Sequence, residues 1–407
     1  MSHRYDVVVV GLGAVGACAA WQAARRGARV LAVDPHPPGH RHGSSHGGSR
    51  IHRLALFEGA EHVPLARRSR RLVDELAAAG DAADLFVRSG GLVVGPPGSA
   101  RVQRAQAVLA AADEPHEVWD AARLAARYPA LDTADPADAE DVAVWEPGAG
   151  VLRPERVVVA AAAAATRCGA ELALGERCEA VEPGGAGVRV RTTAGLVRAG
   201  ALVLAGGAWL PRMLVEAGLL APGSPRVRVQ RSVLAWFPAR PGTPSARWRA
   251  PALPVLVRET ADGIAGWGIG DVDGRGVKVG VLGGQGPAAG KRWLDRAEDN
   301  AAPVLAAEGR AAAAVVARLL PGLTPSPSEL AACMDAYTAD RRVLLGPVAG
   351  WPGVVVCGGL SGHGFKHAPA LGEAAACLAL GLDPGLDLAA FDPGRLLGQP
   401  GERRQHL

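Results

Sequence analysis

The chain has 407 residues, 49% of them hydrophobic and 21% charged, a balance typical of a globular protein long enough for two domains. Its formal net charge is +4, with acidic and basic residues interspersed and no long basic run, so we expect no nucleic acid partner. The longest apolar stretches, Val157–Thr166 and Ala201–Leu210, are too short to cross a bilayer, so we also expect no membrane partner.

The beginning of the chain has the pattern of a dinucleotide-binding unit. The apolar run Val7–Val10 is typical of a parallel strand buried on both faces, and the glycine motif GLGAVG follows it directly. Ala17–Arg26 then favours a helix, and Arg29–Val33 favours a second apolar strand that ends at Asp34. Because a carboxylate at this distance binds the ribose of a nucleotide, we predict a nucleotide site. The alternative is an α/β unit that binds none.

The glycine motif carries little weight alone, because 54 of the 407 residues are glycine and about one such pattern is expected by chance. Its place between a strand and a helix makes it informative. Gly11 permits a tight turn, Gly13 lets the backbone approach a pyrophosphate, and Gly16 lets the helix pack on the strand. Ala14 and Val15 complete this predicted cofactor-binding loop.

In the rest of the chain, segments with the hydrophobic pattern of a strand alternate with segments that have the pattern of a helix. We expect further strands at Gly91–Val94, Val188–Thr192, Leu196–Arg198, Ala201–Leu204, Leu330–Cys333 and Gly353–Cys357, and helices at Val102–Ala112, Val157–Ala165 and Pro369–Leu380. Short strands and Pro/Gly turns predict an antiparallel sheet from Pro222 to about Gly290. The predicted fold is therefore α/β: a doubly wound, Rossmann-like domain (residues 1–85, 148–220 and 330–407) with an inserted antiparallel-sheet substrate domain (86–147 and 221–329).

The cysteines and the N-terminus bear on the cellular setting. Six cysteines are scattered without CxxC or zinc-type spacing, so we expect reduced thiols, no metal site and a cytoplasmic protein. The first predicted strand begins almost at once, which leaves no room for a signal peptide.

Several segments together are similar to one family. They are GLGAVG, GSSHGGSRIHR (Gly43–Arg53), EHVPLARRS (Glu61–Ser69), SGGLVVGP (Ser89–Pro96), WEPGAGVL (Trp145–Leu152), GGAW (Gly206–Trp209), GVKVG (Gly276–Gly280), the Cys333 segment and GGLSGHGFK (Gly358–Lys366). In this order they resemble the monomeric sarcosine oxidase family, which includes N-methyltryptophan and pipecolate oxidases and, more distantly, the amadoriases. The resemblance covers nearly the whole chain and implies FAD as the cofactor.

The resemblance assigns roles to the segment after the second strand. It implies that Arg53 binds the substrate carboxylate, that Arg50 and His46 lie near the flavin ring, and that Ser44 contacts the cofactor. A guanidinium suits a carboxylate because it offers a planar bidentate fork. The alternative for both arginines is a solvated helix start.

The glycine-rich turn before the last predicted helix, Gly359–Lys366, is the second place where we expect an anion to bind. Its backbone N–H groups and the helix dipole can face negative charge near the flavin N1–C2 region. The resemblance implies that Lys366 also meets the substrate carboxylate, and the cofactor-binding residues here are Gly359, Gly362, His363, Gly364, Phe365 and Lys366. The alternative is a plain helix-capping loop with a surface lysine.

Two further residues concern oxygen and the flavin linkage. Lys278, between two valines, resembles the family lysine that lies over the flavin and activates O₂, because a preorganised cation stabilises superoxide. The alternative is a strand whose polar face is in solvent. Cys333 aligns with the cysteine that bonds covalently to the flavin 8α carbon, for which a thiolate is a competent nucleophile; the alternative is a buried structural cysteine.

The chain departs from the family at positions of the substrate pocket. Asp335 stands where the family has an aromatic residue, Leu282 where sarcosine oxidases have a histidine, and Ala265–Trp267 where a tyrosine pair is expected. We therefore expect a substrate other than sarcosine, with Asp335 and Trp267 joining Arg53 and Lys366 in binding it.

The expected activity is oxidation of a secondary or N-substituted amino acid. Hydride passes to flavin, water hydrolyses the imine product, and O₂ is reduced to hydrogen peroxide. The alternatives are a flavin dehydrogenase that passes electrons to a partner protein, an amadoriase or cyclic imino acid oxidase of a biosynthetic pathway, an NAD-dependent dehydrogenase, and a non-catalytic flavin-binding subunit. We expect a monomer that meets only a small amino acid substrate and O₂.

Overall fold

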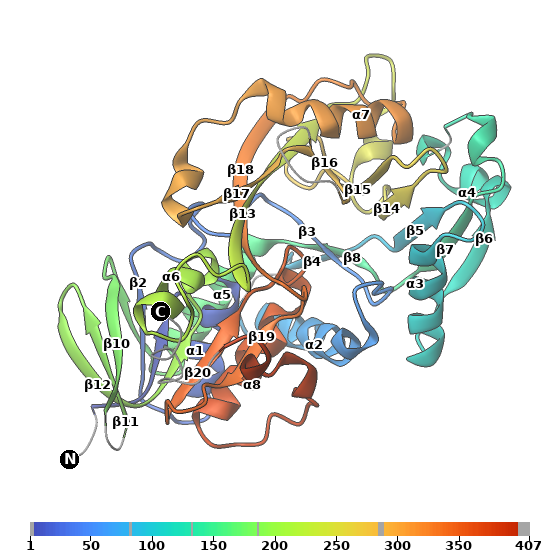
Figure 1. The fold of residues 1–407 in the computed structure, drawn as a ribbon. Coiled ribbons are helices and arrows are strands. Elements are labelled where there is room, and N and C mark those ends of the chain that lie inside the picture. The colour runs from blue at the N-terminus through green and yellow to red at the C-terminus, as the bar shows by residue number, and fades with distance from the viewer. Residues whose placement is uncertain (1–3, 81–83, 132, 185–186, 284–288, 398–407) are drawn as a thin grey trace.

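The computed structural model describes residues 4–80, 84–131, 133–184, 187–283 and 289–397. Figure 1 shows two lobes: one combines the beginning, the middle and the end of the chain, and the other combines two intervening segments. This interleaving agrees with the predicted insertion of one domain into another.

The first lobe is built on an eight-stranded sheet in the order β10-β11-β12-β1-β2-β9, with β20 beside β12 and β19 beside β20. The strands are β1 (Tyr5–Val10), β2 (Val30–Asp34), β9 (Glu171–Leu174), β10 (Cys178–Gly184), β11 (Gly187–Thr192), β12 (Gly195–Leu204), β19 (Leu344–Pro347) and β20 (Val354–Gly358). The central strands are parallel and almost wholly apolar because both faces of the sheet are covered.

Helices cover this sheet. They are α1 (Ala14–Ala24), α2 (Val63–Ala79), α5 (Pro154–Arg167), α6 (Leu210–Glu216) and α8 (Ala368–Ala379). All eleven residues of α1 are buried, because the helix packs between the sheet, α5 and α8. α6 packs on the opposite face of the sheet. The first nucleotide-binding unit is therefore confirmed as strand, glycine turn, helix and strand.

One pair of predicted strands is wrong. The sequence pattern separated Leu196–Arg198 from Ala201–Leu204, but both lie in the continuous strand β12. Its first half pairs antiparallel with β11 at the exposed edge, and its second half pairs parallel with β1 in the core. The change from polar to apolar residues thus marks a change of surroundings along one strand, not a break.

The second lobe holds a nine-stranded sheet in the order β17-β13-β16-β15-β14-β5-β7-β6, with β18 on β13. Its strands are β5 (Gly91–Gly95), β6 (Glu117–Asp120), β7 (Val142–Glu146), β13 (Val227–Phe237), β14 (Val255–Glu259), β15 (Ala265–Ile269), β16 (Val277–Val281), β17 (Lys291–Leu294) and β18 (Glu329–Thr338). The pairing from β13 to β17 is antiparallel, as predicted. Helices of this lobe are α3 (Ala100–Ala111), α4 (Ala121–Arg127) and α7 (Arg310–Leu319).

β18 crosses the domain limit that we predicted at residue 330. The expected strand there is present, but it pairs with β13 over its whole length and so belongs to the second sheet. We propose that the limit lies near the end of β18, at about Thr338, where the chain passes back to the first lobe.

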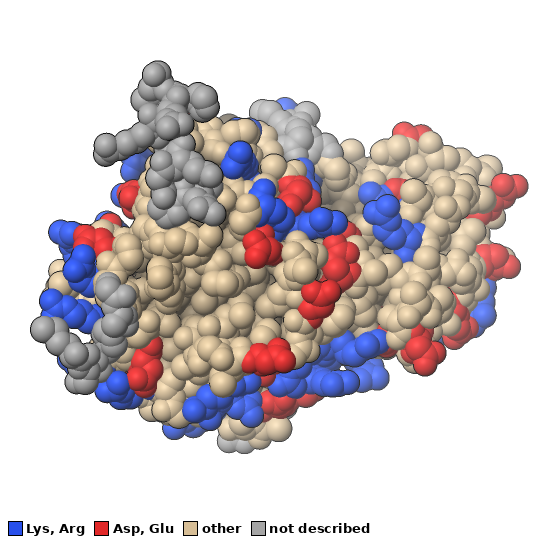
Figure 2. Space-filling view, turned by 60° about the horizontal axis from the view of Figure 1, so that its bottom comes forward, with Lys and Arg blue, Asp and Glu red and all other residues tan. Residues whose placement is uncertain are grey.

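A three-stranded sheet of β3 (Arg50–His52), β8 (Gly150–Leu152) and β4 (Phe86–Arg88) lies between the lobes (Figure 1). It places the Arg50 segment at the junction of the two large sheets. On the face shown in Figure 2, basic and acidic side chains are interspersed. Among the helices of the described residues, none is long and apolar enough to cross a membrane.

Candidate active site

A cavity of about 830 Å³ lies where the two lobes meet. Its wall combines the Arg50 segment, the cavity face of β13, β15 and β16, the middle of β18, and the turn from Leu360 to Lys366. In β16, Val277 and Val279 point into the core against α7, so Lys278 and Gly280 point the other way, toward the cavity.

A smaller pocket continues from this cavity toward the first glycine motif. It is lined by the Gly11–Val15 turn, Asp34, His40 and the Gly358–Leu360 segment. Both spaces share a set of lining residues: Ala14, Ser44, Ser45, Asp335 and Leu360. The result is one elongated space, which suits a dinucleotide lying from Asp34 toward Lys278.

The glycine turn has the geometry that the sequence predicted. Gly11 has φ +94°, and a Cβ there would lie 2.5 Å from the Ala205 carbonyl oxygen. A Cβ on Gly16 would lie 1.7 Å from the Gly11 carbonyl oxygen, so only glycine lets α1 pack this closely. The Leu12 N–H donates to Asp34 at 2.7 Å, which holds the carboxylate at the end of the turn. These residues fit the adenosine and pyrophosphate parts of FAD.

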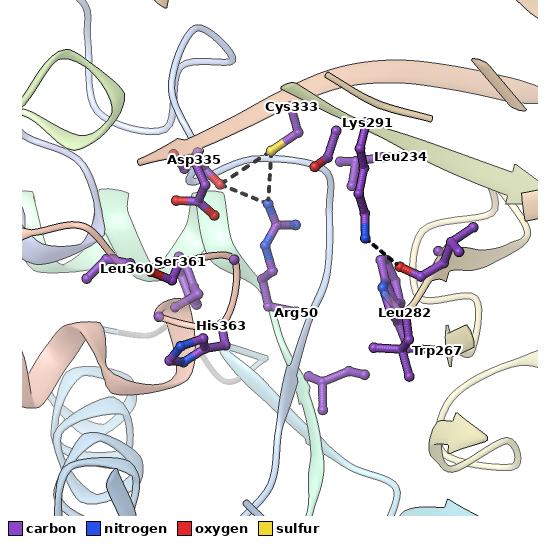
Figure 3. A pocket seen from close by; sticks show the side chains of 18 of the residues that line it. Arg50, Leu234, Trp267, Leu282, Lys291, Cys333, Asp335, Leu360, Ser361 and His363 are labelled. Carbon is purple, nitrogen blue, oxygen red and sulfur yellow. Dashed lines mark hydrogen bonds between the residues drawn. The ribbon is translucent and has the colours of Figure 1, made fainter. Parts of the chain in front are cut away.

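Arg50 lies at the centre of the cavity (Figure 3). Its guanidinium donates to the Ser44 carbonyl oxygen at 2.8 Å and to the Ser49 carbonyl oxygen at 2.9 Å. Cys333 Sγ lies 3.7 Å from the same guanidinium. Ser44 Oγ donates to the Met334 carbonyl oxygen at 2.6 Å, so this loop is tied directly to β18.

Cys333 differs from the core cysteines in its surroundings. Burial raises the pKa of its thiol, and the Arg50 guanidinium opposes that rise. Burial raises the pKa of Cys18 to about 12. Cys18 and Cys357 both pack among apolar residues of the first core. Cys333 thus lies on the cavity wall with a cation beside it, and the charge of Arg50 favours the thiolate form of this residue.

Arg53 and Lys366 both form ion pairs with Glu58, a residue that the sequence analysis did not predict for the site. Glu58 Oε1 accepts from Arg53 Nη2 at 2.8 Å and from Lys366 Nζ at 3.3 Å. Arg53 also donates to the Ala55 carbonyl oxygen and lies over the Phe57 ring at 4.1 Å. Both lysine and arginine are buried, so the alternatives of a surface lysine and a solvated arginine are wrong.

Electrostatics of this cluster follow from burial and proximity. Burial raises the pKa of Glu58, but the Arg53 and Lys366 charges outweigh it and hold the pKa below its ordinary value. Burial lowers the pKa of Lys366 to about 8, with Glu58 opposing the shift. No periodicity in the sequence pointed to Glu58; an acid five residues after a predicted carboxylate-binding arginine was the available signal.

Lys278 is buried between two indoles. Its ammonium lies 5.9 Å from the ring centroids of both Trp236 and Trp267. Nζ donates to the Gly47 carbonyl oxygen at 3.1 Å and to the Ser49 carbonyl oxygen. The side chain is 1% exposed, so the alternative of a solvated strand face is wrong. Burial, and next Arg50, hold the pKa of Lys278 well below its ordinary value.

The remaining predicted residues fall on different sides of Arg50. Figure 3 shows Asp335, Leu360, Ser361 and His363 on one side and Trp267, Leu282 and Lys291 on the other. Burial raises the pKa of Asp335 to about 6, against the effects of Arg50 and a hydrogen bond with Ser44. Asp335 and Trp267 both line the larger pocket, but they lie on opposite sides of Arg50, and Asp335 also lines the smaller pocket.

His46 and the glycine turn before α8 complete the predicted set. His46 is buried beside Arg50, behind the lining residues of the cavity. Burial and then the Arg50 charge lower its pKa to about 4, so the imidazole is neutral at pH 7. In the turn, Gly359 and Gly362 have φ of +64° and +80°. His363, Gly364 and Phe365 line the cavity beside Lys366.

Fold and site together define a flavin-dependent oxidoreductase: the chain belongs to the FAD dependent oxidoreductase family, which it matches over residues 6–378. It is 36% identical over 403 residues to monomeric sarcosine oxidase of Streptomyces avermitilis, which covers 98% of this chain and 100% of that protein. It is 31% identical over 388 residues to N-methyl-L-tryptophan oxidase of Salmonella heidelberg, covering 95% and 98% of the two chains.

A solved structure supports the fold. A variant of NikD, described as an unusual amino acid oxidase essential for nikkomycin biosynthesis, superimposes with a TM-score of 0.81 over 100% of both chains at 23% identity. The predicted family, the predicted fold class and the predicted class of FAD-dependent amine oxidoreductase are confirmed.

Proposed function

We propose that the protein oxidises a secondary or N-substituted amino acid, with FAD as cofactor and O₂ as electron acceptor. The observation that carries this proposal is the meeting of Arg53 and Lys366 at one carboxylate, Glu58, on the wall of a cavity that continues to Asp34. Two cations that already share one carboxylate oxygen are placed to bind a second carboxylate, that of an amino acid.

The chain's own residues would hold the cofactor along the elongated space. Asp34 would bind the ribose, the Gly11–Gly16 turn the pyrophosphate, and Ser44 and Arg50 the flavin end. Linkage of Cys333 to the flavin 8α carbon would replace one S–H and one C–H bond by a C–S bond. The two electrons and two protons released would reduce O₂ to hydrogen peroxide.

Substrate binding is then a matter of orientation. The substrate carboxylate would displace Glu58 from Arg53 and Lys366, which fixes the rest of the molecule inside the cavity. When bound, FAD supplies the acceptor for a hydride from the carbon next to nitrogen and passes the electrons to O₂. The substrate amine must be neutral for this transfer. Trp267 and Leu282 offer an apolar wall to the substrate side chain.

Lys278 supports the oxygen step. A buried ammonium between indoles is a preorganised positive charge in a site of low dielectric, so it stabilises the negative charge that develops as O₂ accepts an electron. Asp335 lies between the two pockets, and we assign it to the cofactor side of Arg50.

The decisive experiment is purification followed by a substrate screen. We expect a yellow protein that stays yellow after acid precipitation and releases peroxide with N-methyl amino acids, cyclic imino acids or fructosyl amino acids. A colourless protein, or reduction of the flavin by substrate without peroxide, would contradict an oxidase. The variant Cys333→Ala should lose its flavin on acid precipitation; retention would contradict the linkage.

Location and assembly are also proposals. We infer a cytoplasmic monomer, on the grounds that the cysteines lack disulfide spacing and that each lobe contributes to one cavity within a single chain. Gel filtration with light scattering would measure the mass directly, and a dimer would contradict the monomer.

A further inference from the structure

Two carboxylates, the buried Glu146 and the half-buried Glu155, hold the segment that carries Arg50 and Arg53, although neither lines the cavity. Glu146 is the last residue of β7, and Glu155 is the second residue of α5. The short strand β8 lies between them, so one stretch of chain presents both carboxylates to the segment.

Glu155 binds a pair of backbone N–H groups. Its Oε1 accepts from Gly47 N at 2.6 Å and from Gly48 N at 3.0 Å. Gly47 and Gly48 have φ of +95° and +75°, a conformation in which successive N–H groups converge on one anion. A Cβ at Gly47 would also lie 2.5 Å from Leu234 Cδ1, so the leucine side chain would have to move.

The same peptide group binds Lys278 at its other end. The Gly48 N–H and the Gly47 carbonyl belong to one peptide unit, and that carbonyl oxygen accepts from Lys278 Nζ at 3.1 Å. The Glu155 carboxylate, the peptide dipole and the Lys278 ammonium are therefore aligned. The N–H end of the peptide faces the negative charge, and its carbonyl end faces the positive charge. The partners that the structure gives Nζ are carbonyl oxygens, so Glu155 acts on Lys278 through the backbone.

Glu146 has the corresponding arrangement beside Arg53. Its two oxygens accept from Leu54 N at 2.9 Å each, and Oε2 also accepts from Ala55 N at 2.9 Å. The carbonyl of Ala55 in turn accepts from the Arg53 guanidinium. Glu146 thus holds the backbone on which Arg53 folds back toward Glu58.

We propose that Glu155 and Glu146 are positioning residues with separate tasks: Glu155 orients Lys278 for the reaction with O₂, and Glu146 orients Arg53 for the substrate carboxylate. This division rests on the proposed function. The charged and titratable groups that face Lys278 are Arg50, Cys333, Glu155, Arg275 and His46. Of these, Glu155 is the carboxylate that favours the charged form of Lys278, so its loss removes support for the ammonium.

Hydrogen exchange of the purified, flavin-loaded protein tests the contacts directly. Glu155→Gln should speed exchange in the peptide that contains Gly47 and Gly48, and Glu146→Gln in the peptide that contains Leu54 and Ala55. The control Glu179→Gln, at an exposed position of β10, should change neither. Equal acceleration of both peptides in either variant would overturn separate tasks.

Reoxidation of the chemically reduced flavin tests whether Glu155 affects the reaction with O₂, and it needs no amino acid substrate. With flavin reduced by dithionite and mixed with O₂, Glu155→Gln should react about tenfold more slowly. The alkaline loss of rate should also move down by about one pH unit, because the ammonium loses a nearby opposite charge. Glu155→Asp should restore part of both. A uniform loss of rate without a shift in the pH profile would overturn a role through Lys278.

Glu146→Gln should leave reoxidation unchanged but weaken binding of acetate, used as a carboxylate probe, about tenfold. Slower reoxidation in this variant, or unchanged acetate binding, would overturn its assignment. If the protein oxidised no amine, the proposed function would fail, yet reoxidation and hydrogen exchange would still decide the tasks of both glutamates.

Discussion

Two buried lysines line the same cavity in different surroundings. Lys366 has a carboxylate partner, Glu58, at 3.3 Å, and its pKa is lowered by burial to about 8. Lys278 donates to backbone carbonyl oxygens between two indoles, and its pKa lies well below the ordinary value. The contact ion pair with Glu58 favours the charged form of Lys366, whereas the charge at Lys278 depends on groups that act at longer range.

The largest expected effect concerns Lys278. Lys278→Met should slow reoxidation of the reduced flavin by O₂ on the order of 100-fold, because it removes a preorganised cation from a site of low dielectric. Reduction by substrate should change far less. Stopped-flow absorbance measures both steps. The matched control is Lys291→Met, since Lys291 lines the same cavity but donates to the Val281 and Gly283 carbonyls. Equal losses in both variants would contradict a special role for Lys278.

The next largest effect concerns Arg53, which we propose binds the substrate carboxylate together with Lys366. Arg53→Lys should lower kcat/KM about 100-fold, or roughly 3 kcal/mol, because an ammonium cannot replace the bidentate fork. Reoxidation by O₂ should keep its rate, which separates this end of the cavity from the Lys278 end. An unchanged kcat/KM would mean that Arg53 does not bind the substrate.

A smaller effect, opposite in sign, is expected at Glu58. Glu58→Gln removes the anion that occupies Arg53 and Lys366, so acetate should bind about tenfold more tightly. Because Glu58 raises the pKa of Lys366, the comparison belongs at pH 6, where the lysine stays protonated in both proteins. Flavin absorbance on titration gives the dissociation constant, and weaker binding would show that Glu58 supports the site instead of competing for it.

The smallest effect is a pH dependence. Lys366 is cationic below its pKa of about 8 and neutral above it, so the dissociation constant of acetate should be level near neutral pH and rise as the pH passes 8. In Lys366→Met binding should be weaker throughout, with no rise near pH 8. A profile that is the same in both proteins would assign the titration to another group.

Much of the fold could be predicted because it depends on local pattern. A buried parallel strand is apolar throughout, and Gly16 is required by the Gly11 carbonyl oxygen, five residues earlier in the chain. The hydrophobic pattern does not predict an element that passes from one surrounding to another. It divides the continuous strand β12 in two, and it does not place β18 in the second sheet.

The candidate site could be predicted only in part. Lys278, Arg53 and Lys366 are predicted through the family resemblance, and all three line one cavity of the structure. Glu58, Glu146 and Glu155 were missed, because each acts through partners that are distant along the chain or through backbone groups that carry no side-chain signature.

By itself, the sequence determined the nucleotide-binding unit from Tyr5 to Asp34. Its strand, turn, helix and acid are consecutive in the chain, and the apolar composition of the strands and the helix predicts that they are buried. Only the tertiary structure decided which charges face one another. It set a carboxylate between Arg53 and Lys366 and joined Glu155 to Lys278 through one peptide group, because electrostatic partners are chosen by distance in space.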